Sequence, residues 1–575
     1  MTNVLSEIIQ RCEWIGVIGS ASSNTIFNVD AMEEAYQKGL VGNFCIAEFK
    51  QDGHPAFALG QVVSIVMENP YLERHSVRKI VSVRGEANPL TEKHDVRRLE
   101  MMLGSAYSWS NERVVPIIVS SVPPTGTRIH LLSQAVVDEL TKQQKTEITV
   151  VGKLYNTSIH LPTIFRHFGK GVGGLGEAYH LGIFGKTGSG KSVLAKMVMA
   201  AYARHDDMSI LVVDPQGEYG RELTNDGQLK GILSRLKRNA SVFDISRIAL
   251  ADLDSLKRIL IVSGFVDVLG VRAEENRVYA AEVIGDFFAR VHTIPTATGA
   301  PIHVSLSVAG DRVVFERLMD HIRDNIRRIY IAQEAQTRVL DTLAGQRERL
   351  YNRWVPIANL FSIAGGKVSI DRVVQDAYRA KNFTVIDLSE ISARDVYWSD
   401  KVMAIIIKDI MKSLKNVGGT IYRRGDLLNL LVVTDEAHRL VPRETPTDED
   451  FKTLKDEFVD AVLTTRKYGL GWMFISPSLA SLELEILRQL RLYFFGYGLS
   501  WGGERRVLEE LVGRGAHIDL YQSFRDPQTS AILGQKQYPF MVHGPVSPLS
   551  VSGGPLFFTA LDYYSEFSKA NPFLS

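Results

Sequence analysis

Residues 181–192 read Leu181-Gly182-Ile183-Phe184-Gly185-Lys186-Thr187-Gly188-Ser189-Gly190-Lys191-Ser192. An apolar run that is typical of a buried strand leads into the pattern G-x-x-x-x-G-K-[ST], and residues 193–202 then favour a helix. Glycines in such a loop let backbone N–H groups close around phosphate oxygens, and the helix N-terminus adds partial positive charge. The stretch therefore predicts a P-loop that binds a nucleoside triphosphate, taken to be ATP.

Two residues at the end of this loop have expected chemical roles. The Lys191 ammonium is expected to reach the β- and γ-phosphates, and the Ser192 hydroxyl to ligate Mg²⁺. A glycine-rich turn without a ligand would not explain the flanking strand and helix. The expected binding residues are Gly185, Lys186, Thr187, Gly188, Ser189, Gly190, Lys191 and Ser192.

Composition limits the class of protein. A chain of 575 residues is too long to fold around one hydrophobic core, and about three to four domains are expected. A net charge of +1 means that any nucleic-acid surface must be local. Cys12 and Cys45 have no metal-like spacing, which argues against a disulfide framework or zinc site. Neither a signal peptide nor an apolar run of about 18 residues is visible, so a cytoplasmic protein without membrane contact is expected.

The N-terminal part, residues 1–155, is β-rich. Short apolar runs separated by Gly, Pro and Asp/Asn turns predict a small antiparallel barrel. The runs are 14–20, 43–49, 56–67, 79–86, 114–122 and 147–155. The glycine-rich stretch 169–176 is predicted to be a flexible connector.

Strands and helices alternate after the P-loop, which predicts a mostly parallel α/β sheet. The expected strands are 209–214, 383–389, 427–438, 472–476 and 492–498, with helices at 396–415, through 458–467 and at 482–490. Residues 255–379 are instead mostly of helical type, with apolar residues such as Phe315, Leu318 and Ile322 at helical spacing. They predict an inserted helical bundle with a solvated face of mixed charge. The ATPase core is thus predicted at 156–254 and 380–540, with a tail at 541–575.

The run Leu430–Thr434 ends in Asp435 and Glu436, as a Walker B strand does. Asp435 is expected to hold the Mg²⁺ shell, and Glu436 to polarise the attacking water as general base. Two acids that simply cap a strand are the weaker alternative once a P-loop lies upstream. The gap between Lys191 and Asp435 leaves room for at least one additional strand.

A second acidic pair follows the strand after the P-loop. Asp214 and Glu218 lie in the sequence VDPQGEY, and residues at the carboxyl ends of parallel strands face the ligand crevice. Both are therefore candidate neighbours of the γ-phosphate or Mg²⁺. An Asp-Pro/Gly turn without contact to the ligand explains the same residues equally well.

The set HLGIFGKTGSGKS, VVDPQGEY, VVTDEAHRLVP and TTRKYGLG resembles the HerA branch of the HerA/FtsK ATPases. The resemblance extends over most of the chain and implies a RecA-like P-loop core behind an N-terminal HAS-barrel. It also implies a homohexamer that uses ATP to move double-stranded DNA, beside a nuclease or, in antiphage defence, an NAD-degrading effector. No nuclease or NADase motif is visible in this chain.

The resemblance places Arg466 as the arginine finger that reaches a neighbouring subunit's ATP, with Arg439 and Arg443 as alternatives. The chain departs from the family after the next strand. The family has an S-Q-x-P-like sensor there, whereas Ser476-Pro477-Ser478 contains no Gln, and Gln489 lies in the following helix. This departure puts the coupling of hydrolysis to movement in doubt, but not nucleotide binding.

DNA contacts are weakly specified. Two groups of basic residues could contact phosphates: Lys230, Arg235, Lys237 and Arg238, and the pair Arg423-Arg424. For each group, an ordinary solvent-exposed patch is the favoured interpretation. The aromatic tail 557–564 is either a strap onto a neighbour or ordinary packing on its own domain. The expected function is therefore an ATP-driven DNA translocase or helicase. The alternatives are an ATP-regulated ring that scaffolds and activates an effector, and a membrane-associated conjugation or secretion ATPase, which the lack of a spanning segment disfavours.

Overall fold

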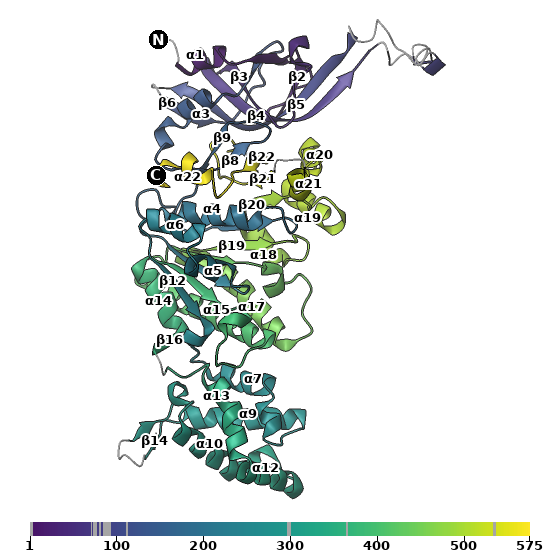
Figure 1. Ribbon diagram of the computed structural model, residues 1–575. Coiled ribbons are helices and arrows are strands. Elements are labelled where there is room, and N and C mark those ends of the chain that lie inside the picture. The colour runs from purple at the N-terminus through teal and green to yellow at the C-terminus, as the bar shows by residue number, and fades with distance from the viewer. Residues whose placement is uncertain are drawn as a thin grey trace.

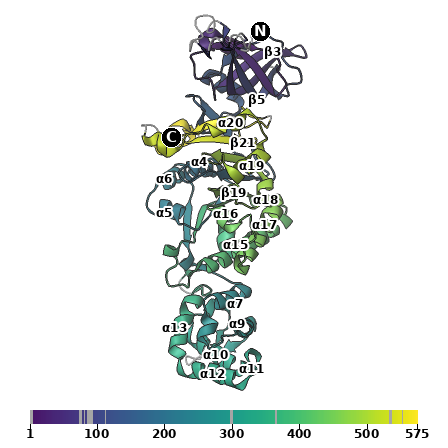
Figure 2. The same ribbon diagram turned by 90° about the vertical axis from the view of Figure 1, so that its right-hand side faces the viewer.

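A computed structural model describes residues 4–70, 72, 78–79, 82–83, 94–110, 113–295, 301–363, 366–532, 536–551 and 553–574. Figures 1 and 2 show three parts stacked along one axis: a β-barrel, a central α/β sheet and a helical bundle at the far end. None of the described helices has the length and apolar character required to cross a bilayer.

The N-terminal strands form a closed antiparallel barrel, as the sequence predicted. Its sheet order is β2-β1-β7-β3-β4-β5-β6, and an additional β2–β5 pairing closes six of the strands. The strands are β1 (Trp14–Ile18), β2 (Ile26–Ala31), β3 (Phe44–Gln51), β4 (His54–Glu68), β5 (Val96–Ser110), β6 (Arg113–Ile117) and β7 (Arg128–Leu131). The expected strand 79–86 lies mostly outside the described residues.

The barrel ends earlier than the sequence indicated. The run 147–155 forms β8 (Ile148–Leu154), which pairs with β9 (His160–Ile164) in the central sheet and not with the barrel. The barrel is instead fixed to that sheet by the buried Gln61, whose side-chain amide exchanges two hydrogen bonds with the Phe557 backbone, at 2.8 and 3.1 Å.

The central sheet has 11 strands in the order β12-β17-β11-β18-β19-β10-β20-β21-β22-β8-β9. The parallel strands are β12 (Ala240–Asp244), β17 (Phe383–Asp387), β11 (Ser209–Asp214), β18 (Leu430–Thr434), β19 (Leu470–Ser476), β10 (His180–Phe184) and β20 (Leu490–Gly496). The antiparallel strands β21 (Pro539–His543), β22 (Leu556–Ala560), β8 and β9 extend one side. Strand β19 lies between β10, which leads into the P-loop, and β18, which leads into Asp435. One additional strand therefore separates the two motifs, as expected.

Helices cover both faces of this sheet, which explains why its central strands are apolar throughout. Successive side chains of a strand point to opposite faces of the sheet. On β11, Leu211 and Val213 therefore pack in one cluster with α15 (Asp400–Arg423) and α17 (Glu449–Thr465). Ile210 and Val212 pack in a second cluster with α4 (Lys191–Ala203) and α6 (Gln228–Arg235). The smaller helix α18 (Leu484–Gln489) precedes β20.

The predicted helical bundle is present, at the end of the molecule opposite the barrel (Figures 1 and 2). It contains α7 (Leu253–Val262), α8 (Phe265–Val268), α9 (Glu274–Ala289), α10 (Arg312–Asp324), α11 (Ile326–Ile329), α12 (Gln333–Gly345) and α13 (Arg347–Ala358) around the fully buried Trp354. The short pair β13 (Ile248–Ala249) and β16 (Val368–Ser369) joins its two connections to the core. The bundle ends before residue 379, because α14 (Ile370–Ala380) packs on β11 and α15.

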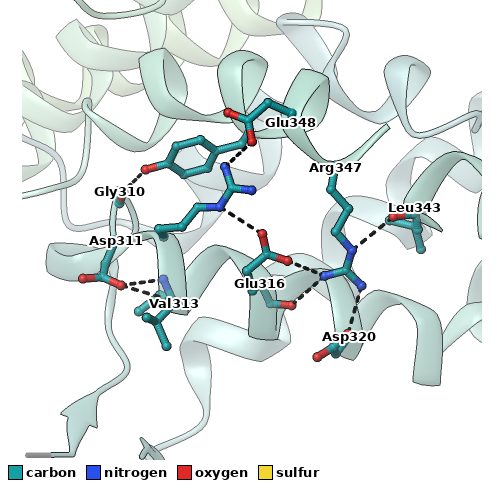
Figure 3. Close-up of polar contacts among 11 residues, drawn as sticks. Gly310, Asp311, Val313, Glu316, Asp320, Leu343, Arg347 and Glu348 are labelled. Carbon is teal, nitrogen blue, oxygen red and sulfur yellow. Dashed lines mark hydrogen bonds and ion pairs between the residues drawn. The ribbon is translucent and has the colours of Figure 1, made fainter. Parts of the chain in front are cut away.

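Charged residues of the bundle pair with one another, as a face of mixed charge predicts. Arg312 contacts Glu316 and Glu348 at 2.9 and 2.8 Å, and Arg347 contacts Glu316 and Asp320 at 2.6 and 3.0 Å (Figure 3). These ion pairs connect α10 to the start of α13. The arginines are thus occupied by carboxylates within the chain.

The glycine-rich stretch differs from its expected form, and the tail takes one of its two expected forms. The glycine-rich stretch 169–176 is folded back on itself, since Leu175 N–H donates to His167 O at 2.9 Å and Gly176 N–H to Gly169 O at 3.0 Å. In the tail, β22 is a strand of its own chain's sheet, and Phe557, Phe558 and Tyr563 are buried there. Packing on its own domain, one of the two expected alternatives, therefore accounts for these three aromatic residues.

Candidate nucleotide-binding site

The P-loop connects β10 to α4, as predicted. Its glycines Gly185, Gly188 and Gly190 have φ values of 150°, 85° and 92°, a region that L side chains rarely adopt. A Cβ on Gly190, the residue that precedes α4, would lie 2.6 Å from Tyr538 Cδ1. The loop therefore requires glycine both for its backbone and for the close approach of Tyr538.

Lys191 lies at the first position of α4, with its ammonium turned toward the loop. Its Nζ donates a hydrogen bond to Lys186 O at 3.1 Å. Burial lowers the pKa of Lys191, while the nearby carboxylates of Asp435 and Glu436 act to raise it. The P-loop follows the carboxyl end of β10 and Asp435 follows that of the parallel strand β18, so Lys191 shares one site with Asp435 and Glu436.

Asp435 is the most perturbed carboxyl of this site. It follows β18, is 8% exposed and accepts the Glu436 N–H at 2.8 Å. Burial, together with the charges of Glu218, Glu436 and Asp214, raises the pKa of Asp435 to about 7. Several acids in a poorly solvated space repel one another, so this arrangement favours a bound cation.

Glu436 has a backbone conformation that is unusual for a non-glycine residue. Its φ and ψ are 51° and 38°, in the left-handed region, directly before the short helix α16 (Ala437–Leu440). Such strain occurs at sites where the surrounding structure fixes a side chain for function. The Glu436 carboxylate lies 3.6 Å from His438 Nδ1 and is half-buried, so water has access to it.

Asp214 and Glu218 have different surroundings. The fully buried Asp214 accepts three backbone N–H groups, from Glu218, Tyr219 and Gly220, at 2.9–3.1 Å, and so holds the start of α5 (Glu218–Thr224). Burial raises the pKa of Asp214, against these hydrogen bonds. Glu218 Oε2 lies 3.5 Å from Ser192 Oγ. Of the pair, Glu218 is the one beside the expected metal ligand.

The residues present fit a hydrated Mg²⁺ and a phosphate chain. Two buried hydroxyls, Ser189 Oγ in the loop and Tyr219 Oη, have no hydrogen-bond partner within the described chain. Burial raises the pKa of Tyr219 well above its ordinary value, and Asp435 is the next largest cause. No three His, Cys, Asp or Glu side chains among the described residues could form a metal cage alone. Mg²⁺ in nucleotide sites takes phosphate and water oxygens with one or two protein ligands, which Ser192 and Asp435 could supply.

The position after β19 has serines in place of a sensor amide. The fully buried Ser476 donates to Ser478 O at 2.7 Å, and Ser478 Oγ donates to Glu504. Glu504, on α19 (Gly502–Val512), also accepts the Leu479 N–H at 2.8 Å. Gln489 precedes β20 and lies at the other end of the strands, so it does not replace the missing amide.

Arg466 lies far from the P-loop of its own chain. It is exposed and precedes the amino end of β19, whereas the P-loop follows the carboxyl end of the parallel neighbour β10. Because β19 has seven residues, these two ends are roughly 20 Å apart. By contrast, Arg439 is on α16 next to Glu436, and Arg443 donates to Ala480 O at 3.3 Å.

The basic cluster on and after α6 is largely used within the chain. Arg238 donates to Asp206 O at 2.8 Å and also to Met208 O, and Lys230 pairs with Asp226 at 2.6 Å. Arg235 Nη1 is 3.5 Å from Leu574 O. The exposed Arg423 and Arg424 end α15 at the same edge of the sheet as Arg466.

Sequence reasoning missed three residues of the site. Lys196 forms ion pairs beside Ser192, Tyr538 contacts the P-loop, and Glu504 holds the turn after β19. Of these three residues, only Lys196 has a pattern in the sequence that points to the site, because it lies about one and a half helical turns after Lys191 on the same helix. The other two come from segments distant in sequence.

A match to a family model supports the P-loop assignment. Residues 178–410 match the family model described as "Helicase HerA, central domain". No curated protein matches the chain. The solved structures similar to it include VirB4 of Thermoanaerobacter pseudethanolicus, the bacterial conjugative coupling protein TrwBdeltaN70, and the genome packaging NTPase B204 from Sulfolobus turreted icosahedral virus 2 in complex with AMPPCP.

These likenesses are distant. VirB4 is 14% identical, with 72% of this chain and 96% of that chain covered and a TM-score of 0.38. TrwBdeltaN70 is 13% identical, with 76% and 93% covered and a TM-score of 0.37. B204 is 10% identical, with 67% and 98% covered and a TM-score of 0.28.

Proposed function

Because residues 178–410 match the family model of the HerA central domain, we propose that this chain is an ATP-hydrolysing motor that works as a homohexameric ring on double-stranded DNA. The P-loop ATPase fold is the established part. The ring, the DNA substrate, and a nuclease or NAD-degrading effector partner, with a role in DNA end processing or antiphage defence, are the proposed part. A cytoplasmic location fits that role.

Each proposed active-site residue has one task. The loop 185–192 and Lys191 bind the triphosphate, and Glu436 accepts a proton from the attacking water. Ser192 and Asp435 would hold Mg²⁺, which neutralises phosphate charge when bound. Arg466 of the adjoining subunit would stabilise the charge that develops on the γ-phosphate.

One observation carries this proposal. Lys191, Asp435 and Glu436 share a site, while Arg466 lies at the opposite edge of the same sheet. An exposed arginine there is out of reach of its own nucleotide but free to meet that of a neighbour. ATP hydrolysis that requires assembly, measured as turnover per chain against protein concentration, tests this. Turnover per chain that does not vary down to the monomer would refute the proposal.

The serines after β19 favour a second candidate function, a ring that assembles and activates an effector without sustained DNA movement. Ser478 and Glu504 form a closed turn with no amide directed at the nucleotide, so a coupling element is missing there. ATP turnover with and without double-stranded DNA separates the two functions. Stimulation by DNA supports the motor, whereas indifference to DNA together with effector activation supports the scaffold.

A further inference from the structure

A buried ion pair connects the P-loop helix to α5. Lys196, on α4, has a side chain that is only 8% exposed, and its Nζ lies 2.7 Å from Glu218 Oε1 and 2.5 Å from Glu222 Oε1. Glu218 and Glu222 are four residues apart on α5 and therefore share one helix face. A buried ammonium is costly unless it is fully paired, so this geometry is tightly determined.

The far end of this network is fixed by the backbone. Glu222 Oε2 accepts the N–H of Leu229, in the first turn of α6, at 3.2 Å. The near end of α5 is fixed by Asp214, which accepts three backbone N–H groups. Lys196 therefore connects Glu222, which the backbone of α6 holds in place, to Glu218. Of the Glu218 carboxylate, only Oε1 pairs with Lys196, and Oε2 is available for another contact.

That remaining oxygen points to the metal site. Glu218 Oε2 is the atom 3.5 Å from Ser192 Oγ, the hydroxyl expected to ligate Mg²⁺. We propose that Lys196 is a positioning residue that holds Glu218 beside Ser192, so that Glu218 supports binding of the divalent cation that accompanies the nucleotide. This inference rests on the proposed ATPase function. It assigns a role to Lys196 and Glu222, which do not touch the ligand themselves.

Charge and position must be separated in the test. Replacing Lys196 alone removes a positive charge near the cation, which by Coulomb attraction would favour cation binding. The double variant Lys196→Met/Glu222→Gln removes one charge of each sign and leaves Glu218 without its anchor. The matched control is Lys230→Met/Asp226→Asn, which removes a surface ion pair of 2.6 Å between Lys230 in the first turn of α6 and Asp226 before it.

The measurement uses Mn²⁺ as a paramagnetic probe, titrated into the full-length protein with bound ATP-γ-S and followed by electron paramagnetic resonance. Residues that hold the side chains of a metal site in place typically contribute 10–100-fold to metal affinity, so the double variant should bind Mn²⁺ about tenfold more weakly or worse. Its affinity for ATP-γ-S in EDTA, and the Mn²⁺ affinity of the control variant, should equal those of the wild type.

Two outcomes would overturn the inference alone: a folded double variant that binds Mn²⁺ as tightly as the wild type, or an unchanged affinity in Glu218→Gln. The Glu218→Gln variant keeps the Lys196–Glu222 pair and decides the question if the double variant does not fold. A wild-type protein that takes up no Mn²⁺ with the nucleotide would overturn the proposed ATPase function and this inference with it.

Discussion

Glu436 and Arg466 lie at opposite ends of neighbouring parallel strands: Glu436 comes after the carboxyl end of β18, and Arg466 comes before the amino end of β19. At opposite edges of one sheet, the proposed general base and the proposed arginine finger cannot act on the same γ-phosphate in one chain. They can do so if two chains meet edge to edge.

The first prediction concerns the general base. Glu436→Gln should leave ATP binding within about twofold of the wild type but reduce turnover by about 10²-fold or more, because the amide cannot accept a proton from water. Calorimetric titration with ATP and steady-state phosphate release give the two numbers. The matched control is Glu444→Gln, an exposed residue of the loop after α16, which should retain turnover. Equal turnover in Glu436→Gln would remove Glu436 from the mechanism.

The second prediction concerns the glycine next to α4. Gly190→Ala places a Cβ 2.6 Å from Tyr538 Cδ1 at a φ of 92°, so the loop or the tyrosine must move. ATP affinity should fall by about tenfold or more, while the unfolding temperature changes little if the damage stays within the loop. Gly173→Ala, also at positive φ but without atoms nearby, is the control for backbone strain alone. ATP affinity that is preserved in Gly190→Ala would show that the contact with Tyr538 does not constrain the loop.

The third prediction concerns a buried acid between the core and the bundle. Asp409, on α15, accepts a hydrogen bond from Ser255 at 2.9 Å, and burial raises the pKa of Asp409 to about 6. Folding therefore favours the protonated form, and ionisation of Asp409 reduces stability as the pH rises from about 4 to 6. Asp409→Asn should raise the free energy of unfolding at pH 8 by on the order of 2 kcal/mol, with little gain near pH 4.

Thermal unfolding of Asp409→Asn and the wild type at both pH values measures this difference. The control is Asp376→Asn, an exposed residue of α14 whose replacement should have a small effect at either pH. A gain in Asp409→Asn that is the same at pH 4 and pH 8 would mean that the charge of Asp409 is not its cause.

Local patterns predicted the parts of the fold that depend on local sequence. The P-loop string, the apolar run before Asp435 and the helical spacing of residues 312–324 each determine their own element. The run 147–155 was assigned to the wrong sheet, because an alternating strand has the same pattern whichever sheet it joins. Its partner β22 lies some 400 residues away, and only packing in three dimensions brings the two together.

Local sequence likewise predicted only those residues of the site that belong to short motifs. Lys191, Ser192, Asp435 and Glu436 belong to motifs whose spacing carries the chemistry. Asp214 could not be separated from Glu218 by sequence, because the difference between them is that backbone N–H groups occupy the Asp214 carboxylate. Tyr538 and Glu504 reach the site from the segment after β20, for which no motif exists.

The most direct test of a site shared between subunits is to mix two inactive variants. Arg466→Ala keeps an intact base but has no finger, and Glu436→Gln keeps an intact finger but has no base. With random mixing, about a quarter of the interfaces would join an intact Glu436 to an intact Arg466 from the adjoining subunit. ATP hydrolysis should therefore return in the mixture although each variant alone is inactive. A mixture that forms mixed assemblies by native mass measurement yet remains as inactive as its components would contradict the account, as would an Arg466→Ala variant that hydrolyses ATP at the wild-type rate.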